Sequence, residues 1–291
     1  MSKVLVAMSG GVDSSVTLLK ILEAGHDPIG ITMKLWEYKY MGGNNLQDNN
    51  CCAVESINNA KLVCERLGVP HYTVDFTEDF KEKVVENFVS EYKSGRTPNP
   101  CVRCNSYVKW DTFINQADKL GAEYIATGHY AIIDNDDGLY KIKRGKDKIK
   151  DQSYVLWGIP KETLSRTILP LGDLTKKEVR DIARKNSLET ADTPESMEIC
   201  FVADNNYKRF IKEYTGESLN NNKSKGKTLD TTGKKIGDNP GYINYTIGQR
   251  KGIGISNPDP LYVKEIDASE NTITVSGKKS LFSDKCKISN I

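Results

Sequence analysis

The sequence lacks an apolar run of about 18 residues, the length at which a helix can span a bilayer, so we expect no membrane-spanning segment. We also expect no secretory signal, because the N-terminal segment Met1–Met8 runs directly into Ser9-Gly10-Gly11 without a cleavage-type segment. This start indicates a buried first strand, and we expect a cytosolic protein. No internal repeat is visible, and the net charge of +2 is too small to indicate a nucleic-acid partner by itself.

The chain has 291 residues, of which 38% are hydrophobic and 27% are charged, as in an ordinary globular protein with one large or two smaller domains. Two stretches are basic. Residues 139–152 contain six basic and two acidic side chains, and residues 206–260 contain ten and five. Such stretches suit a polyanion on part of the surface. Solvated lysine-rich loops are the alternative.

Seven cysteines occur without a secretory signal, so metal binding or catalysis is a better explanation than structural disulfides. Cys64 lies in an apolar helical pattern, which predicts a buried core residue. Cys286 is near the C-terminus and is interpreted as incidental. Cys51 and Cys52 are neighbours in a polar loop, Tyr38–Asn50 and its continuation, and their role stays open.

The first half of the chain alternates between short apolar runs and helical patterns, which predicts an α/β fold with a parallel sheet and helices on both faces. Gly25 is expected to end the first helix. The predicted strands are Val4–Met8, Pro28–Met33, His71–Val74 and Glu123–Thr127; the predicted helices are Ser14–Ala24, Ser56–Leu67, Lys81–Ser94 and Trp110–Leu120.

The pattern changes after about residue 205, where glycine and asparagine become frequent and helical periodicity fades. We predict a first domain over residues 1–205. A small β-rich domain over residues 206–270 follows a helix at Tyr207–Tyr214. The last segment, Leu261–Ile291, has strand-like pieces at Leu261–Ile266 and Thr272–Val275 but is too short for an independent barrel.

The strongest motif is Ser9-Gly10-Gly11-Val12-Asp13-Ser14, between a predicted strand and a predicted helix. Glycines allow the tight turn, and backbone N–H groups at a helix N-terminus form a phosphate site. The motif lacks the Lys-Ser/Thr ending of a Walker loop and the dinucleotide pattern. It resembles the loop of ATP enzymes that adenylate an oxygen and release pyrophosphate. A purely structural turn is the alternative.

The second motif is Asn99-Pro100-Cys101-Val102-Arg103-Cys104-Asn105, with Cys200 distant in sequence. A single Cys-x-x-Cys is compatible with redox, zinc or iron–sulfur roles. A structural zinc site would need two further ligands, and the sequence has no second Cys-x-x-Cys.

With these motifs the chain resembles the tRNA-specific 2-thiouridylase family, which sulfurates uridine 34 at the anticodon wobble position. The matching blocks are collinear and extend over nearly the whole chain. They are Ala7–Ser14, Asn99–Asn105, Ala126-Thr127-Gly128-His129-Tyr130, Lys150-Asp151-Gln152-Ser153-Tyr154, Glu195–Phe201 and Gly241–Gly254.

The resemblance implies a role for each matching position. Implied ATP-binding residues are Ala7, Met8, Ser9, Gly10, Gly11, Val12, Asp13, Ser14, Met33 and Gly128. Implied tRNA-binding residues are Asn99, Pro100, Cys101, His129, Lys150, Asp151 and Gln152, and the pair Arg250 and Lys251 suits phosphate contact. Implied catalytic residues are Cys104 as nucleophile, Cys200 as persulfide carrier and Asp13, which would help to position Mg²⁺.

The chain departs from the family pattern at Cys101, where the family commonly has an acidic residue. Three thiolates, from Cys101, Cys104 and Cys200, could ligate a [4Fe–4S] cluster with one open iron, as in the iron–sulfur-dependent branch of tRNA thiolation enzymes, and we favour this interpretation. The alternative is a persulfide on Cys200 that Cys104 attacks by thiol–disulfide exchange. The second departure is length, since family members usually carry a complete C-terminal β-barrel of which 271–291 would be a remnant. This departure would affect how the chain binds tRNA and would not affect the chemistry.

The implied reaction uses ATP to adenylate the C2 oxygen of a flipped-out uridine, after which sulfur displaces AMP. The sulfur donor would be sulfide or a persulfide-carrying protein, and the RNA partner would be the tRNA anticodon arm. This mechanism requires Cys104 and Cys200 to converge beside the ATP phosphates. The alternatives are a non-catalytic tRNA-binding relative and another pyrophosphate-releasing enzyme, such as an amide-forming ligase.

Overall fold

The computed structural model describes residues 1–36, 54–194, 199–202, 204–216 and 225–285. The predicted loop Tyr38–Asn50 and the cysteines at 51, 52 and 286 lie outside these residues. The chain divides into two compact units. The first consists of Met1–Val85 and Asn99–Asn205, and the second of Glu86–Pro98 and Asn206–Ile291. Each unit is described by itself.

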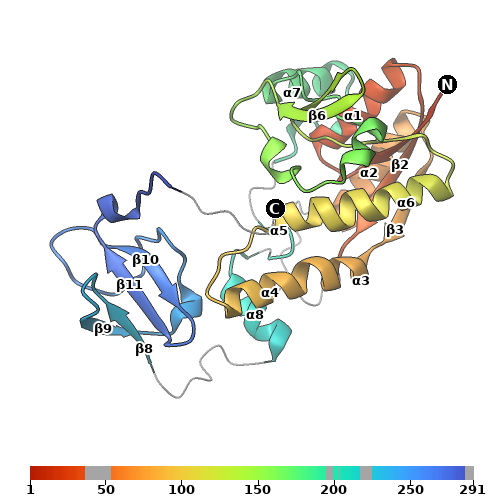
Figure 1. Cartoon of the computed structure of the whole chain (residues 1–291). Coiled ribbons are helices and arrows are strands. Elements are labelled where there is room, and N and C mark those ends of the chain that lie inside the picture. The colour runs from red at the N-terminus through yellow and green to blue at the C-terminus, as the bar shows by residue number, and fades with distance from the viewer. Residues whose placement is uncertain (37–53, 195–198, 203, 217–224, 286–291) are drawn as a thin grey trace. The chain divides into compact units, whose positions relative to one another are not determined.

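The first unit is built on a five-stranded, all-parallel sheet with the strand order β3-β2-β1-β4-β7. Figure 1 labels β2 and β3 of this sheet. The strands are β1 (Lys3–Ala7), β2 (Asp27–Lys34), β3 (His71–Asp75), β4 (Tyr124–Ala126) and β7 (Thr167–Ile168). Strand β1 is central, and its apolar residues Val4, Leu5 and Val6 are fully buried. A strand that is buried on both faces explains why this segment is a continuous apolar run in the sequence.

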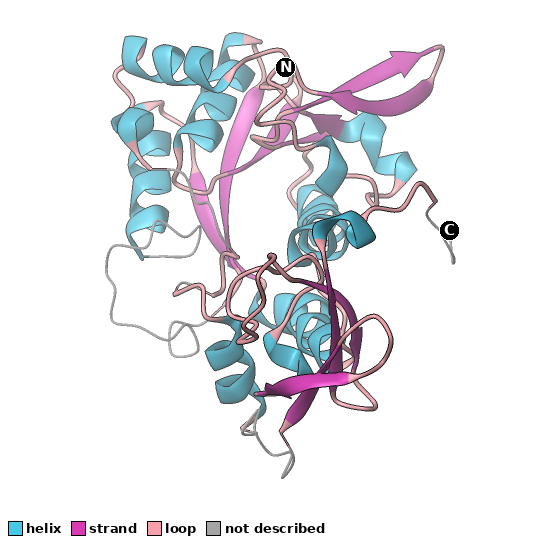
Figure 2. Ribbon diagram, turned by 90° about the vertical axis from the view of Figure 1, so that its left-hand side faces the viewer, coloured by secondary structure: helices cyan, strands magenta, loops and turns pink. Residues whose placement is uncertain are grey.

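Helices cover both faces of this sheet, as predicted (Figure 2). On one face, α1 (Val12–Glu23), α2 (Val54–Arg66) and α7 (Lys176–Lys185) share a core with Val4 and Val6. On the other, α6 (Asp111–Lys119) packs against β4 and buries Phe113 completely. Gly25 follows α1 with a φ of +79°, so the helix ends where the glycine predicted.

Short helices follow β3 in the first unit. They are α3 (Thr77–Phe80), a π-helical turn (Lys81–Val85) and α5 (Pro100–Cys104), which continues into a second π-helical turn (Asn105–Trp110). The helix predicted over Lys81–Ser94 is therefore divided, because its second half forms α4 (Glu86–Lys93) in the other unit.

A β-hairpin that the sequence analysis did not predict joins β5 (Ala131–Asp136) to β6 (Leu139–Arg144). Its turn residues Asp137 and Gly138 both have positive φ, 49° and 87°, as a two-residue hairpin turn requires. Three of the six basic side chains in the 139–152 stretch form ion pairs with acids outside it: Lys141–Asp136, Lys143–Asp134 and Lys146–Glu178. The surface charge of this stretch is thus weaker than the sequence count.

The second unit combines a four-stranded sheet of order β10-β11-β8-β9 with two helices. The strands are β8 (Gly226–Leu229), β9 (Lys235–Asn239), β10 (Tyr262–Asp267) and β11 (Thr272–Ser276). Residues Val263, Ile273 and Val275 form its small core with Tyr245 and Ile253. Thus β11, within the segment 271–291, belongs to the same sheet as β8 to β10.

The helices of the second unit, α4 and α8 (Tyr207–Thr215), pack through aromatic side chains. Tyr92 stacks on Tyr207 with ring centroids 4.5 Å apart, and Phe88 meets Phe210 edge-on. This contact explains why Glu86–Pro98 joins the C-terminal part of the chain.

Candidate functional site

A cavity of about 360 Å³ lies at the carboxyl ends of β1, β2 and β4. The order of the strands along the chain reverses between β1 and β4, which is where ligands bind in open α/β sheets. The lining residues are Ala7, Met8, Ser9, Gly10, Gly11, Val12, Asp13, Ser14, Met33, Leu35, Ser56, Asn59, Lys109, Thr127, Gly128, His129, Tyr130, Lys150, Gln152, Lys176, Thr193 and Pro194.

The glycine loop at the end of β1 is fixed by close packing and by its own hydroxyl groups. Gly10 has a φ of +76°, and a Cβ there would lie 2.1 Å from the Ser56 carbonyl oxygen. The Ser14 hydroxyl donates to the Gly11 carbonyl oxygen at 2.9 Å and accepts from the Ser9 amide at 3.2 Å. The loop therefore leads tightly into the N-terminus of the 12-residue helix α1, which faces the cavity and favours an anion there.

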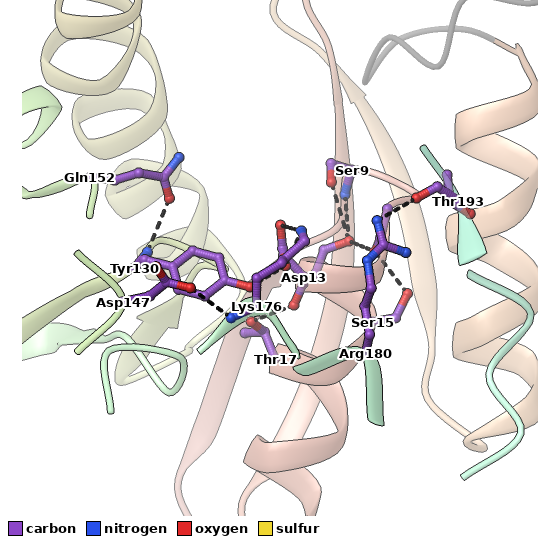
Figure 3. Close-up of polar contacts among 12 residues, drawn as sticks. Ser9, Asp13, Ser15, Thr17, Tyr130, Asp147, Gln152, Lys176, Arg180 and Thr193 are labelled. Atoms are coloured by element: carbon purple, nitrogen blue, oxygen red, sulfur yellow. Dashed lines mark hydrogen bonds and ion pairs between the residues drawn. The ribbon is translucent and has the colours of Figure 1, made fainter. Parts of the chain in front are cut away.

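An ion pair crosses the cavity wall between α1 and α7 (Figure 3). Lys176 Nζ lies 2.8 Å from Oδ1 and 2.7 Å from Oδ2 of Asp13, and the Tyr130 hydroxyl donates to Oδ1 at 2.7 Å. The Lys176 side chain is only 13% exposed. Lys176 thus engages both carboxylate oxygens of Asp13, and Tyr130 engages one of them.

Asp147 holds the backbone of two cavity lysines in place. Its carboxylate accepts the backbone N–H of Lys176 at 3.0 Å, of Ile149 at 3.0 Å and of Lys150 at 3.2 Å. These bonds, with that from Lys176 the strongest, lower the pKa of Asp147. Thr175 and Glu178 form a capping box at the start of α7, so Lys176 occupies a rigid position.

The charge of the lining is cationic. Lys109, Lys150 and Lys176 contribute three positive charges and Asp13 contributes one negative charge, so the described lining carries a net charge of +2. A concave, partly buried site with this charge attracts anions such as polyphosphates.

His129 is a neutral imidazole in this cavity. It is 9% exposed, its Nδ1 lies 2.8 Å from the Thr127 hydroxyl, and its ring lies 5.5 Å from that of Trp110. Burial, with a smaller contribution from the positive charge of Lys109, lowers the pKa of His129 to about 3. At neutral pH this side chain is uncharged, so it can form hydrogen bonds with a ligand without adding positive charge to the cavity.

Gln152 and Asp151 are neighbours with different roles. Gln152 lines the cavity and forms two hydrogen bonds with the backbone of Tyr130. Its side-chain oxygen accepts from the Tyr130 backbone N–H at 3.0 Å, and its backbone N–H donates to the Tyr130 carbonyl oxygen at 2.9 Å. Asp151 instead accepts from the Gly145 amide at 2.9 Å and the Ser153 hydroxyl at 2.9 Å. Its carboxylate therefore shapes the turn that presents Gln152.

The cysteine motif lies outside the cavity lining. Asn99 caps α5 by accepting from the amides of Cys101 and Val102, and Pro100 is the first residue of the helix. Cys101 is exposed, whereas Cys104 is buried. Cys64 is buried as predicted, and burial raises its pKa to about 12.

Cys104 and Cys200 are connected through one segment of the first unit. Phe201, next to Cys200, packs edge-on against Phe80 with ring centroids 5.4 Å apart. The turn Lys81–Val85 that follows Phe80 packs against α5, which carries Cys104. Phe80 also contacts Trp36, just beyond the cavity-lining residue Leu35. The residue after Cys200 and the helix that carries Cys104 thus contact the same short segment, Phe80–Val85.

The described residues do not form a ready metal site. No group of three or more His, Cys, Asp or Glu side chains among them could hold a metal ion. Cys101, Cys104 and Cys200, with their different exposures, are not assembled as a three-thiolate ligand set in this part of the chain. Nor does any described helix combine the length and apolar character needed to cross a bilayer.

The cavity brings together all ten residues predicted for ATP, and His129, Lys150 and Gln152 of the set predicted for tRNA. It does not include Asn99, Pro100, Cys101, Cys104, Asp151 or Cys200, and Arg250 and Lys251 are exposed residues of the second unit. The sequence motifs did not assign a role in the site to Lys109, Tyr130 or Lys176. A signal for Lys176 existed, since lysine is unfavourable in the first turn of a helix and Thr175-x-x-Glu178 predicts a helix start there.

A parallel sheet whose first strand runs into a glycine loop, with a cationic cavity at the reversal of strand order, defines an α/β domain of the adenine nucleotide α-hydrolase type. Residues 2–204 match the family model "tRNA methyl transferase HUP domain", and residues 208–277 match "tRNA methyl transferase PRC-barrel domain".

Several similar proteins share a name. The tRNA-specific 2-thiouridylase MnmA of Salinibacter ruber is 48% identical over 96% of this chain and 73% of its own length. The corresponding proteins of Amoebophilus asiaticus, 48% identical over 94% and 72%, and Carboxydothermus hydrogenoformans, 46% identical over 97% and 76%, match similarly. The chain belongs to the tRNA-specific 2-thiouridylase family.

Proposed function

We propose that this protein is an ATP-dependent tRNA-uridine 2-sulfurtransferase, which adenylates the C2 oxygen of uridine 34 and replaces it with sulfur. The observation that carries the proposal is that the pyrophosphatase-type loop and the implied base-contacting residues His129, Lys150 and Gln152 line one cationic cavity. Family membership supports the same activity. Because tRNA is the proposed substrate, we place the reaction in the cytosol.

ATP would bind with its phosphates on the loop Ser9–Ser14 and its adenine near Met33 and Gly128. Gly128 packs against the start of α1, where a Cβ would lie 3.1 Å from the Asp13 backbone carbon. A larger residue would therefore move the wall of the cavity. Lys176 adds an ammonium group that can follow the phosphates as pyrophosphate leaves, and Lys109 and Lys150 strengthen the positive potential.

The described cavity lining offers few ligands for Mg²⁺. Proteins bind Mg²⁺ through one or two carboxylates together with substrate phosphates, and Asp13 is the one carboxylate among the described lining residues. Asp13 would hold the ion only after releasing Lys176, which in turn becomes available to the phosphates. When bound, the ion would neutralise phosphate charge.

The RNA would lie over the cavity with the target base turned out of its stack. Neutral His129 can hydrogen-bond the uracil edge, and Gln152 is held in place by Tyr130. The helix start Asn99, Pro100 and Cys101 would border the base. Arg250 and Lys251 of the second unit would contact phosphates elsewhere on the tRNA.

For the sulfur step we propose a persulfide on Cys200, loaded by a persulfide-carrying protein. Its terminal sulfur attacks C2 of the adenylated base, and AMP leaves with the former C2 oxygen. The Cys104 thiolate then attacks Cys200 Sγ and breaks the bond between the two persulfide sulfurs. This leaves 2-thiouridine and a Cys104–Cys200 disulfide, which an external thiol reduces. The shared segment Phe80–Val85 supports the approach of these cysteines.

The three-thiolate cluster is the second candidate for the sulfur step. It is favoured only by the cysteine at position 101, and the described residues do not assemble it. Anaerobic reconstitution with iron and sulfide decides between them. The persulfide route predicts that Cys101→Ala retains full activity without iron, whereas loss of both the cluster absorption and the activity in that variant would establish the cluster.

The proposed activity is tested by mass spectrometry of nucleosides from unmodified tRNA after incubation with ATP and a sulfur source. Exchange of oxygen for sulfur and addition of a methyl group give different masses, so the name of the matching family model is tested too. A non-catalytic tRNA-binding relative would release no AMP when tRNA is added. Another pyrophosphate-releasing enzyme would exchange pyrophosphate into ATP without thiolating RNA.

A further inference from the structure

Two large aromatic side chains are exposed on the segment that leaves the cavity. Lys150 and Gln152 line the cavity, and the next residues form a short 3₁₀ turn, Ser153–Val155. Val155 and Leu156 point inward and are buried, while Tyr154 is 62% exposed and Trp157 is 75% exposed. Water contact with rings of this size is unfavourable, so neighbouring exposed aromatics mark a surface that binds something.

The same segment reaches the helix that carries the cysteine motif. Asn105, which follows Cys104, donates to the Val155 carbonyl oxygen at 3.4 Å. Gly158 packs so closely on Ser106 that a Cβ would lie 2.5 Å from its hydroxyl oxygen. Residues 150–158 therefore form a continuous path from the cavity to the π-helical turn that continues α5, and both exposed rings lie on it.

A third exposed aromatic and nearby cations extend this path. Tyr107, next to Ser106, is 48% exposed, and the Arg103 guanidinium lies 4.7 Å from its ring centroid. Lys148 is exposed just before the path begins. Alternating rings and positive charges are what single-stranded RNA requires, because bases stack on rings while phosphates meet cations.

We propose that Tyr154 and Trp157 form a stacking platform for the unpaired bases that flank the target uridine in the RNA loop. This inference rests on the proposed function, since it uses the same cavity and the same RNA. Stacking here would hold the loop in place while the target base alone enters the cavity. Tyr154 and Trp157 are positioning residues and do not touch the reacting atoms.

Tryptophan fluorescence tests the platform directly. The chain has three tryptophans, and Trp36 and Trp110 are only 7% and 0% exposed, so Trp157 is the one that a soluble quencher such as acrylamide can reach. Titration with unmodified tRNA is expected to quench Trp157 and to protect it from acrylamide. Trp157→Phe is the matched control, which should bind tRNA like the wild type but lose the tRNA-dependent signal.

Affinity provides the second readout. Filter binding of Trp157→Ala should show tRNA binding weakened by about tenfold, in line with loss of one base–aromatic stack, and the KM for tRNA should rise while the KM for ATP does not change. Because Trp157 is exposed, circular dichroism should show a folded variant. Tyr154→Ala should behave in the same way.

Three outcomes would overturn the platform. Wild-type protein could bind and thiolate tRNA with no change at Trp157, which leaves the proposed function intact. A persulfide-carrying donor protein could protect Trp157 where tRNA does not, which would assign the rings to that protein. A chain that neither binds nor thiolates tRNA would refute both proposals.

Discussion

Lys176 Nζ lies 2.7 Å from Asp13 Oδ2, although the two residues are 163 positions apart in the sequence. Asp13 is in the first turn of α1, directly after the glycine loop, and Lys176 is the first residue of α7. The pair thus joins the predicted phosphate loop to an element that the sequence analysis did not include in the site. Phosphate oxygens and Asp13 would compete for the same ammonium group.

Replacement of Lys176 by methionine tests this relationship. The variant Lys176→Met removes a cation that is largely shielded from water, so we expect ATP binding to weaken by about tenfold or more, equivalent to roughly 1.4 kcal/mol. The measurement is the KM for ATP in pyrophosphate–ATP exchange. Lys177→Met is the matched control, because Lys177 is the next residue of α7 and is exposed. Equal KM values for both variants would refute a role of Lys176 at the phosphates.

Alanine substitutions at two glycines with similar positive φ distinguish the effect of backbone strain from that of a steric clash. Gly10 and Gly25 have φ of +76° and +79°, but only Gly10 would place a Cβ against other atoms, 2.1 Å from the Ser56 carbonyl oxygen. Gly25→Ala should cost roughly 1–2 kcal/mol of unfolding free energy and leave ATP binding intact. Gly10→Ala should cost more and should abolish ATP binding. Urea denaturation and nucleotide binding measure both; indistinguishable variants would mean that the loop is not tightly packed.

The lowered pKa of His129 makes the free energy of unfolding depend on pH. Its folded-state pKa, about 3, is below the unfolded value of about 6.5, so the unfolded chain binds a proton that the folded chain does not. The stabilisation is complete above pH 6.5 and is lost as the pH falls towards 3. At pH 5 this loss is about 2 kcal/mol. His129→Gln should lose less stability than the wild type between pH 7 and pH 5 in urea denaturation, and an identical loss would contradict a buried neutral imidazole.

Thiol labelling distinguishes the cysteines of the first unit. Cys101 is exposed, whereas Cys64 is buried with its pKa raised to about 12. Because only the thiolate reacts, iodoacetamide at pH 8 should modify Cys101 in the native protein and spare Cys64. Peptide mapping by mass spectrometry reads the result, and denatured protein is the control in which both react. Rapid native labelling of Cys64 would show that the core around α2 opens.

The sequence predicted the parts of the site whose signals are local. The loop Ser9–Ser14 is recognisable because glycines, a preceding apolar strand and a following helix are contiguous, and the structure confirms that sheet and helix arrangement. The partnership of Lys176 with Asp13 could not be deduced, since it depends on how α7 packs against α1. The hairpin Ala131–Arg144 was not predicted, although Asp137-Gly138 is a typical sequence signal for a two-residue hairpin turn.

The number of basic residues in the sequence overestimates the positive charge on the folded surface. The stretch 139–152 is basic in sequence, but Lys141, Lys143 and Lys146 meet carboxylates that are adjacent only after folding. The positive potential that matters comes instead from the cavity lining, where Lys109, Lys150 and Lys176 converge from three separate segments.

The central claim is that one cavity activates the uridine with ATP and that Cys200 supplies the sulfur. The most direct measurement is nucleoside mass spectrometry of unmodified tRNA after reaction with ATP and a persulfide donor, for the wild type and for Cys200→Ala, with tRNA-dependent AMP release measured in parallel. The account predicts 2-thiouridine from the wild type only, with adenylation retained in Cys200→Ala. Thiolation by Cys200→Ala, or none by the wild type, would contradict it.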